Sequence, residues 1–324
     1  MVDLSNIQTL GSNLNRPECV VTHSSGLVFA SDWSGNGGVS VIRPSGKVTR
    51  ILSTHTQPIR PNGIALDTDG SFLLAHLGQE TGGVFRMQSS GETSPLLLDL
   101  GGQPLPPTNF VTRDLNGHCW ITVSTRTIPR AAAYNPTTAD GFVIRLDESG
   151  ANIAADNLGY TNECLVSSDQ STLFVNETFA RRLSAFDIRP DGRLENKRTV
   201  ASFGPGTFPD GLNECSDGSL LITSIVSNRV IQIEPSGKHR LLVEDSDTDH
   251  LAVVEQAFHA GTMGRPHLDT AKSHKLKNIS SLAFTETGGS NAVLGCLLDD
   301  QIYALDLPVC GLTGSGWQAP ITIR

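Results

Sequence analysis

Two carboxylates and four carboxamides stand at equivalent points of a repeated pattern in this sequence. They are Glu18, Asn62, Asn109, Asn162, Asp210 and Asn278. Each opens a short apolar stretch, which is followed by a polar turn cluster and a second apolar run. Oxygen donors of this kind favour Ca²⁺, with Mg²⁺, Mn²⁺ and Zn²⁺ as alternatives. A protein shell that leaves coordination positions open for water and substrate predicts metal-assisted hydrolysis.

The pattern around each of these residues, here called the head residues, predicts a pair of strands. In FPDGLNECSDGSLLIT (208–223), Asp210 opens one strand, Ser216 to Gly218 form a turn, and Leu220 to Ile222 form a buried strand. A second hairpin follows in most units, as in VSVIRPSGKVTRIL (39–52). Each unit therefore predicts four strands, which make one blade of a propeller.

Six such units predict an all-β fold, a six-bladed β-propeller with four-stranded blades that forms one domain over residues 1–324. The sixth unit supplies only three clear strands, at 280–284, 292–297 and 301–305. The isolated stretch at 7–10 is predicted to be its fourth strand. That N-terminal strand would close the ring and remove the exposed edge of an open sheet.

Propeller geometry predicts that the six head residues meet. The innermost strands run along the central axis in one direction, so equivalent residues form a ring at one mouth of the channel. No Lys or Arg occupies a head position. Converging carboxylates without counter-charge suppress each other's ionisation, and a divalent cation would relieve that repulsion. The alternative for any single head is that its side chain satisfies backbone groups of a local turn.

Residues 245–277 form an insertion before the last blade. Leu251, Val254 and Phe258 have helical spacing, which predicts a short amphipathic helix. The segment is either a surface excursion or a lid over one mouth of the channel. In the second case His267 would reach the substrate.

The head residues and their turns resemble the six-bladed propeller lactonases of the gluconolactonase, senescence-marker-protein and luciferin-regenerating-enzyme family. The resemblance is strongest in RPNGIALDTDGSFLLAHLG (60–78) and FPDGLNECSDGSLLIT (208–223). It implies hydrolysis of a lactone with one divalent metal, for which the matching ligands are Glu18, Asn109, Asn162 and Asp210. Two further residues, Asn62 and His76, match the position of the His dyad of the more distant paraoxonases.

These patterns assign roles to the candidate residues. Asp210 and His76 are predicted to be catalytic, as candidates for the general base. The residues predicted to contact substrate are Asn62, Asn109, Asn278 and His267. Phe110 stands where sugar-lactonase relatives often carry Asp, which indicates a less polar lactone or ester. The alternatives are an esterase or phosphotriesterase on the same metal site, or a non-catalytic ligand-binding propeller with a structural metal.

Composition narrows the classes of partner. The net charge of −9 without a basic stripe argues against nucleic acid, and no apolar run approaches a membrane span of about 20 residues. The sequence shows no secretory signal, and its six cysteines form no C-x-x-C pair, which predicts reduced thiols in a cytoplasmic protein. The expected partner is a small lactone or ester. The sequence indicates neither its identity nor an oligomeric state.

Overall fold

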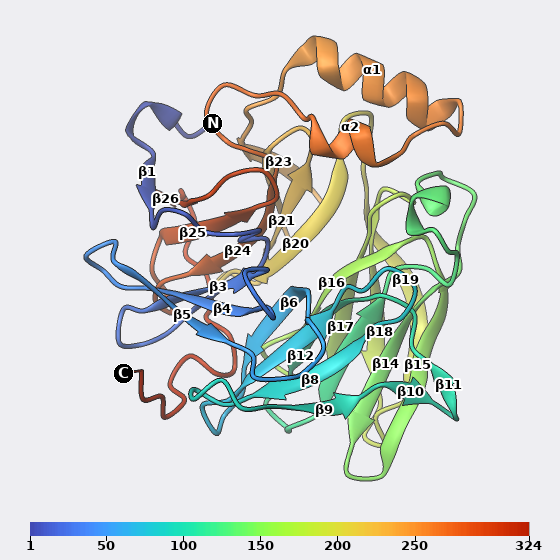
Figure 1. Ribbon diagram of the computed structural model, residues 1–324. Coiled ribbons are helices and arrows are strands. Elements are labelled where there is room, and N and C mark those ends of the chain that lie inside the picture. The colour runs from blue at the N-terminus through green and yellow to red at the C-terminus, as the bar shows by residue number, and fades with distance from the viewer. Residues whose placement is uncertain (324) are drawn as a thin grey trace.

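Six antiparallel sheets of four strands each are arranged around a common centre in the computed structural model, which describes residues 1–323 (Figure 1). In chain order, the strands of the first three blades are β2 (Val20–Thr22), β3 (Val28–Asp32), β4 (Gly38–Ile42) and β5 (Val48–Leu52); β6 (Pro61–Leu66), β7 (Phe72–His76), β8 (Gly83–Met87) and β9 (Thr93–Leu97); β12 (Thr108–Arg113), β13 (Cys119–Val123), β14 (Gly141–Asp147) and β15 (Gly150–Leu158). Those of the last three blades are β16 (Thr161–Val166), β17 (Thr172–Glu177), β18 (Arg182–Ile188) and β19 (Leu194–Ser202); β20 (Phe208–Glu214), β21 (Leu220–Ile225), β22 (Arg229–Ile233) and β23 (His239–Val243); β24 (Ile279–Phe284), β25 (Asn291–Cys296), β26 (Ile302–Asp306) and β1 (Gln8–Leu10).

The N-terminal strand closes the ring. β1 pairs with β26 in antiparallel register, with Gln8 opposite Ala304, so the first and last parts of the chain share one blade. The inner strands contact one another around a closed circuit, in the order β2, β6, β12, β16, β20, β24 and back to β2. The predicted six-bladed propeller with an N-terminal closing strand is therefore confirmed.

Adjacent blades pack through apolar faces. Phe29 of β3 meets Phe72 of β7 edge-to-face, with 5.0 Å between ring centroids. The inner strands lie so close that some positions between them admit only glycine. A Cβ at Gly63 would come within 2.7 Å of Phe110 Cα, and one at Gly211 within 2.6 Å of the Ser280 carbonyl oxygen. These glycines let neighbouring inner strands approach at the level of the head residues.

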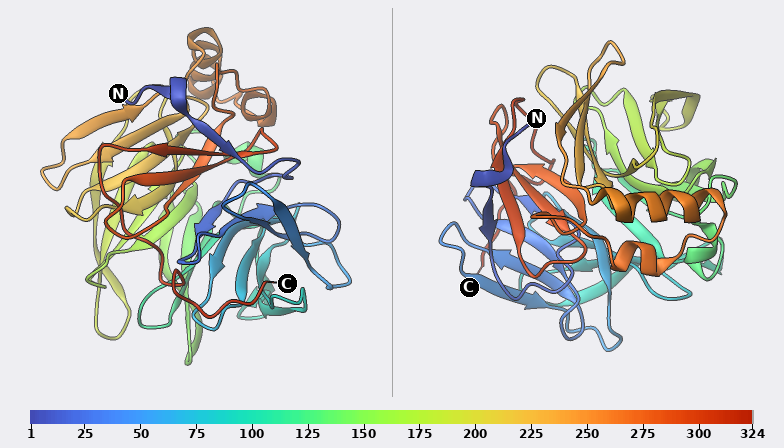
Figure 2. Two further views of the ribbon diagram at one scale, coloured as in Figure 1. Left: turned by 90° about the vertical axis from the view of Figure 1, so that its left-hand side faces the viewer. Right: turned by 90° about the horizontal axis from the view of Figure 1, so that it is seen from above.

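Short helices lie outside the blades. The insertion between β23 and β24 contains α1 (Thr248–His259) and α2 (Arg265–Asp269), which cross one end of the propeller (Figure 2, right). Val254 and Phe258 of α1 are buried, which confirms the helix predicted from their spacing. The other elements outside the blades are η1 (Leu4–Asn6), η2 (Arg130–Ala133) and the unpredicted hairpin of β10 (Asp99–Leu100) and β11 (Gln103–Pro104).

The insertion is packed against the propeller. Phe258 lies 5.4 Å from Phe208 and 6.2 Å from Phe179, measured between ring centroids. Arg181 pairs with Glu255 of α1 through two hydrogen bonds of 2.5 and 3.1 Å. α1 is thus joined to the fourth and fifth blades by an apolar cluster and an ion pair. No helix among residues 1–323 has the length and apolar character needed to cross a membrane.

Candidate active site

β-Bulges direct the head residues towards the channel. The pairing register shifts on β6 between Pro61 and Ile64, on β12 between Thr108 and Phe110, on β16 between Thr161 and Cys164, and on β20 between Pro209 and Leu212. The heads Asn62, Asn109, Asn162 and Asp210 lie inside these four irregularities. A bulge breaks the alternation of a strand and re-aims a side chain, which is why bulges occur beside functional sites.

Five of the six predicted head residues line one cavity. They are Glu18, Asn62, Asn109, Asn162 and Asp210. All five are buried, with exposed fractions of 3–7%. The cavity has a volume of about 40 Å³ and is bounded on its outer side by Tyr134, next to η2, and by Arg265 and Leu268 of α2. The insertion therefore forms one wall of the cavity that holds the head residues.

Neighbouring hydroxyl groups set the orientation of two head amides. Thr178 Oγ1 donates its only proton to the Pro209 carbonyl at 2.8 Å, so towards Asn162 it can only accept. Asn162 Nδ2 donates to that oxygen at 3.2 Å, and Asn109 Nδ2 donates to Ser124 Oγ at 2.9 Å. With both amide nitrogens bonded to hydroxyls, both amide oxygens face the ring, where Asn109 Oδ1 also accepts from Asn62 Nδ2 at 3.3 Å and keeps a second lone pair for another ligand.

Several oxygens of the ring accept no hydrogen bond from the described residues. Asn62 Oδ1 is buried without a hydrogen-bond partner, and Glu18 Oε2 is buried with Arg16 Nε 3.4 Å away but without a hydrogen bond. No side chain among residues 1–323 donates a hydrogen bond to the Asp210 carboxylate. Unpaired buried oxygens are unfavourable unless something else satisfies them. A cation with a preference for oxygen ligands fits this set. The described residues contain no metal-binding group of three His, Cys, Asp or Glu, so such a site must draw on the amides.

For a calcium ion held by this ring, we expect replacement of Thr178 by valine to weaken binding roughly 10- to 100-fold, because groups that orient metal ligands typically contribute that much to metal affinity. Valine keeps the shape of threonine but removes the oxygen that holds Asn162 Nδ2. Thr178→Ser keeps the hydroxyl and should bind calcium as the wild type does. Calorimetric titration with calcium measures both variants, and equal affinities for valine and serine would contradict this orienting role.

A third carboxyl group, not predicted from the sequence, lies beneath the ring. Glu163 follows Asn162 inside the β16 bulge, is buried, and borders the narrow space below the head residues together with Glu18 and Asp210. Its Oε2 accepts from Leu212 N at 2.9 Å. Burial raises the pKa of Glu163 to about 8. Burial also raises the pKa of Asp210 well above its usual range, with smaller contributions from the neighbouring carboxylates Glu18 and Glu163.

Cationic side chains from outside the repeat accompany the ring. Three arginines line the same cavity: Arg16, Arg130 and Arg265. Arg16 Nε lies 3.4 Å from Glu18 Oε2. None of the three stands at a head position. Arg16 lies in the turn before β2, Arg130 lies in η2, and Arg265 lies in α2. Their convergence depends on how these outer segments pack, and the repeat pattern carries no signal for it.

Asn278 is not among the residues that line the cavity. Its Oδ1 accepts from Val226 N at 2.7 Å, and its Nδ2 donates to the Leu268 carbonyl at 2.9 Å. Its backbone is left-handed, with φ of 62°, and it precedes β24 rather than lying within it. The side chain therefore joins the fifth blade to α2. Asn278 thus hydrogen-bonds backbone groups, which is the alternative that the sequence analysis gave for any single head residue.

The two predicted histidines also lie away from the cavity lining. His76 Nδ1 accepts from Arg60 N at 2.9 Å, and burial lowers its pKa to about 4, so the ring is neutral at pH 7. Its neighbour Leu77 lines the cavity instead. His267 Nδ1 accepts from Gly264 N at 3.1 Å at the start of α2. Both imidazoles thus accept a hydrogen bond from a backbone N–H group at the start of a strand or helix.

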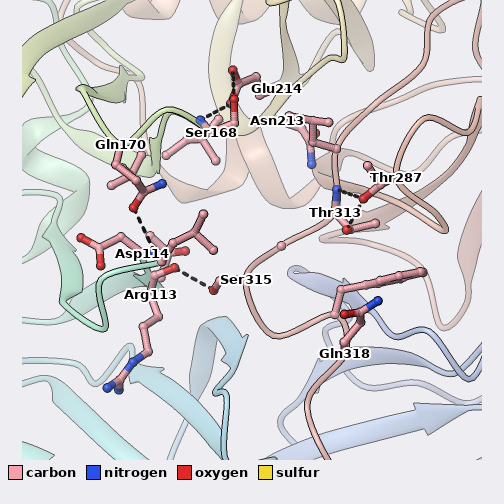
Figure 3. A pocket seen from close by; sticks show the side chains of 17 residues that line it. Arg113, Asp114, Ser168, Gln170, Asn213, Glu214, Thr287, Thr313, Ser315 and Gln318 are labelled. Atoms are coloured by element: carbon pink, nitrogen blue, oxygen red, sulfur yellow. Dashed lines mark hydrogen bonds between the residues drawn. The ribbon is translucent and has the colours of Figure 1, made fainter.

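A larger cavity, of about 440 Å³, lies at the opposite ends of the inner strands (Figure 3). Its wall includes the C-terminal segment from Leu312 to Gln318, which was not predicted. The acidic side chains there have protein partners: Asp114 accepts from Trp120 Nε1 at 2.9 Å, and Glu214 accepts from Ser168 N at 2.7 Å. The unsatisfied oxygens of the head residues make the ring mouth the better candidate for chemistry.

The model of the SMP-30/gluconolactonase/LRE-like region matches residues 17–245 of this sequence, which include five of the six heads. The chain belongs to this family. A lactonase, drp35 of Staphylococcus saprophyticus, is 26% identical over 234 residues, covering 68% of this chain and 67% of the relative.

Solved structures of the family share the fold. A gluconolactonase from Xanthomonas campestris superposes with a TM-score of 0.67 at 21% identity, covering 94% of this chain and 91% of that one. A luciferin-regenerating enzyme gives 0.68 at 14% identity, covering 97% and 100%. A calcium-binding regucalcin of Agrobacterium tumefaciens gives 0.65 at 13% identity, covering 95% of each chain.

Proposed function

We propose that this protein is a lactonase, which opens a cyclic ester with the help of a divalent cation. Glu18, Asn109, Asn162 and Asp210 would hold the cation, and calcium suits their oxygen donors best. The observation that carries the proposal is that the amide nitrogens of Asn109 and Asn162 donate hydrogen bonds to hydroxyl groups. Their amide oxygens therefore lie beside two buried carboxylates. Similarity to a lactonase and to the fold of gluconolactonases and a calcium-binding regucalcin supports it.

Four protein ligands leave coordination positions for substrate, and a cation bound there would polarise the lactone carbonyl and stabilise the charge that develops on its oxygen. Asp210 is the proposed base. It takes a proton from the attacking water as the oxygen–carbon bond forms, and returns that proton to the ring oxygen as the ring carbon–oxygen bond breaks. The net reaction adds one water molecule to the lactone and gives a hydroxy acid as the product. Asn62 and Asn109 are the proposed substrate contacts.

The surroundings of the ring suit a compact, partly apolar substrate. The wall around the carboxylates includes Tyr160, Phe179, Ile225, Leu268 and Leu297. The volume of about 40 Å³ holds only a few water molecules. Entry of a lactone therefore requires an outer segment to move, and we propose the 245–277 insertion as the lid.

Elemental analysis of the purified protein, together with a substrate panel, tests the proposal. The panel contains γ-butyrolactone, δ-valerolactone, glucono-δ-lactone, p-nitrophenyl acetate and paraoxon, each assayed with calcium, with EDTA, and with calcium restored. We expect lactone opening that EDTA abolishes and calcium restores. Faster turnover of the ester or phosphotriester would favour those activities on the same site. A bound metal without any turnover would indicate a ligand-binding propeller, and full lactone turnover in metal-free protein would refute the mechanism.

A further inference from the structure

The cavity that holds the head residues contains more cationic side chains than its carboxylates need. Arg16, Arg130 and Arg265 reach it from three separate segments of the chain. Guanidinium groups present planar, fixed donors that match a carboxylate, so several of them around one cavity are a recognisable arrangement for binding an anion.

The three arginines differ in their partners. Arg16 faces Glu18 at 3.4 Å, and Arg265 pairs with Asp269 one turn along α2 at 2.6 Å. Arg130 has no carboxylate partner among the described residues. Its guanidinium donates to Ser124 Oγ at 3.2 Å, and its Nε is buried without a partner. Arg130 is thus a partly buried cation with an unused donor.

Charge balance sharpens this point. The family and the donor set imply a divalent cation. Even with Glu18, Asp210 and Glu163 all ionised, the carboxylates would contribute only three negative charges. The two charges of the cation, together with those of Arg16 and Arg130, would exceed the three carboxylates by one. An unbalanced charge in a partly buried site is unfavourable, and a neutral substrate would leave it so. An anionic group on the substrate would satisfy it.

The position of Arg130 is consistent with contact to a substrate bound at the ring. Ser124 Oγ accepts from both Arg130 and Asn109, so one side chain separates the guanidinium from a proposed cation ligand. The Arg130 guanidinium also lies over the Tyr160 ring, 5.5 Å from its centroid. The lactone ring would thus face the cation and the aromatic wall, with a substituent directed at Arg130.

We propose that the substrate of this enzyme is a lactone that bears a carboxylate, and that Arg130 recognises that carboxylate, with Arg265 of the insertion next to it. This rests on the proposed lactonase function. It makes Arg130 a determinant of specificity, and it explains why a cationic side chain is placed in each of the two outer segments, η2 and α2.

The test compares γ-butyrolactone-γ-carboxylate with its γ-carboxamide, which has the same shape without the charge. The calcium-loaded wild type should prefer the carboxylate in kcat/KM by roughly 10- to 100-fold, the range expected for hydrogen bonds to a charged group. Arg130→Gln should bring the ratio of the two kcat/KM values close to one, and Arg130→Lys should restore part of the preference.

Arg126→Gln is the matched control. Arg126 belongs to the same β13–β14 connection but pairs with Asp156 at 2.8 Å and does not line the cavity. That variant should keep the wild-type ratio. Equal turnover of both lactones by the wild type would overturn the inference and leave the lactonase function standing.

Calorimetric titration of both compounds separates recognition from catalysis. Tighter binding of the carboxylate that Arg130→Gln abolishes, without turnover of either compound, would uphold the charge recognition and refute the lactonase function. Equal binding of both compounds by the wild type would count against the inference.

Discussion

Replacement of Asp210 by asparagine should lower kcat/KM for lactone opening by roughly 1,000-fold, as expected when one preorganised group of a catalytic centre is lost. The change keeps the size and one oxygen of the side chain. It removes one of the two carboxylates that face the cavity, and with it both a charged ligand and the proposed base. Steady-state kinetics in saturating calcium, with calcium titration of each variant, measure the two losses separately.

The fold should survive this substitution, which makes the result interpretable. The Asp210 carboxylate receives no hydrogen bond from side chains of residues 1–323, and burial raises its pKa, so a neutral amide suits the metal-free cavity better than a carboxylate does. Asp217→Asn is the matched control, because Asp217 lies in the turn at the other end of the same hairpin and accepts from Ser219 N at 2.9 Å. Activity above about a tenth of wild type in Asp210→Asn would exclude the base role, since general base catalysis contributes at least about 100-fold.

The repeat predicted the scaffold of the site well. A head residue, a turn cluster and a closing apolar run mark the inner hairpin in every blade, and a propeller leaves one way to arrange six such units. The closing role of the N-terminal strand followed from counting three strands in the last unit. The ring position of Asn62, Asn109, Asn162 and Asp210 followed from their phase in the repeat, and the bulges that aim them lie at the predicted strand starts.

The sequence failed to predict site residues where tertiary packing, rather than the repeat, determines the position of a side chain. Asn278 shares its phase with the other heads and its residue type with three of them, but its left-handed backbone, with φ of 62°, directs its amide to Val226 and Leu268. Arg130 and Arg265 lie in segments outside the repeat, so no periodicity marks them. Glu163 did carry a signal, since it is a carboxylate within the apolar run of a strand start, directly after a head residue.

Calcium should stabilise the protein most at high pH. Glu18, Glu163 and Asp210 border one narrow space, and burial holds the pKa of Glu163 at about 8 and that of Asp210 well above its usual range. In an unfolded chain Glu163 and Asp210 titrate near 4. The metal-free native state therefore binds protons that the unfolded state releases, so its free energy of unfolding falls as the pH rises from about 4 towards 8.

A cation bound by this ring would take the place of those protons and remove most of that loss. Thermal unfolding with calcium and with EDTA, each at pH 5, 6.5 and 8, measures the effect, because every other titrating group is common to the two samples. At calcium 100-fold above its dissociation constant, binding contributes about 2.7 kcal/mol, which raises Tm by roughly 5 °C in a chain of this size. The difference should be largest at pH 8 and small at pH 5, where protons compete with the cation. Glu163→Gln should flatten the pH dependence of the EDTA sample. Coincident transitions with and without calcium at pH 8 would mean that the oxygens of this ring hold no cation, and the proposed chemistry would fail with it.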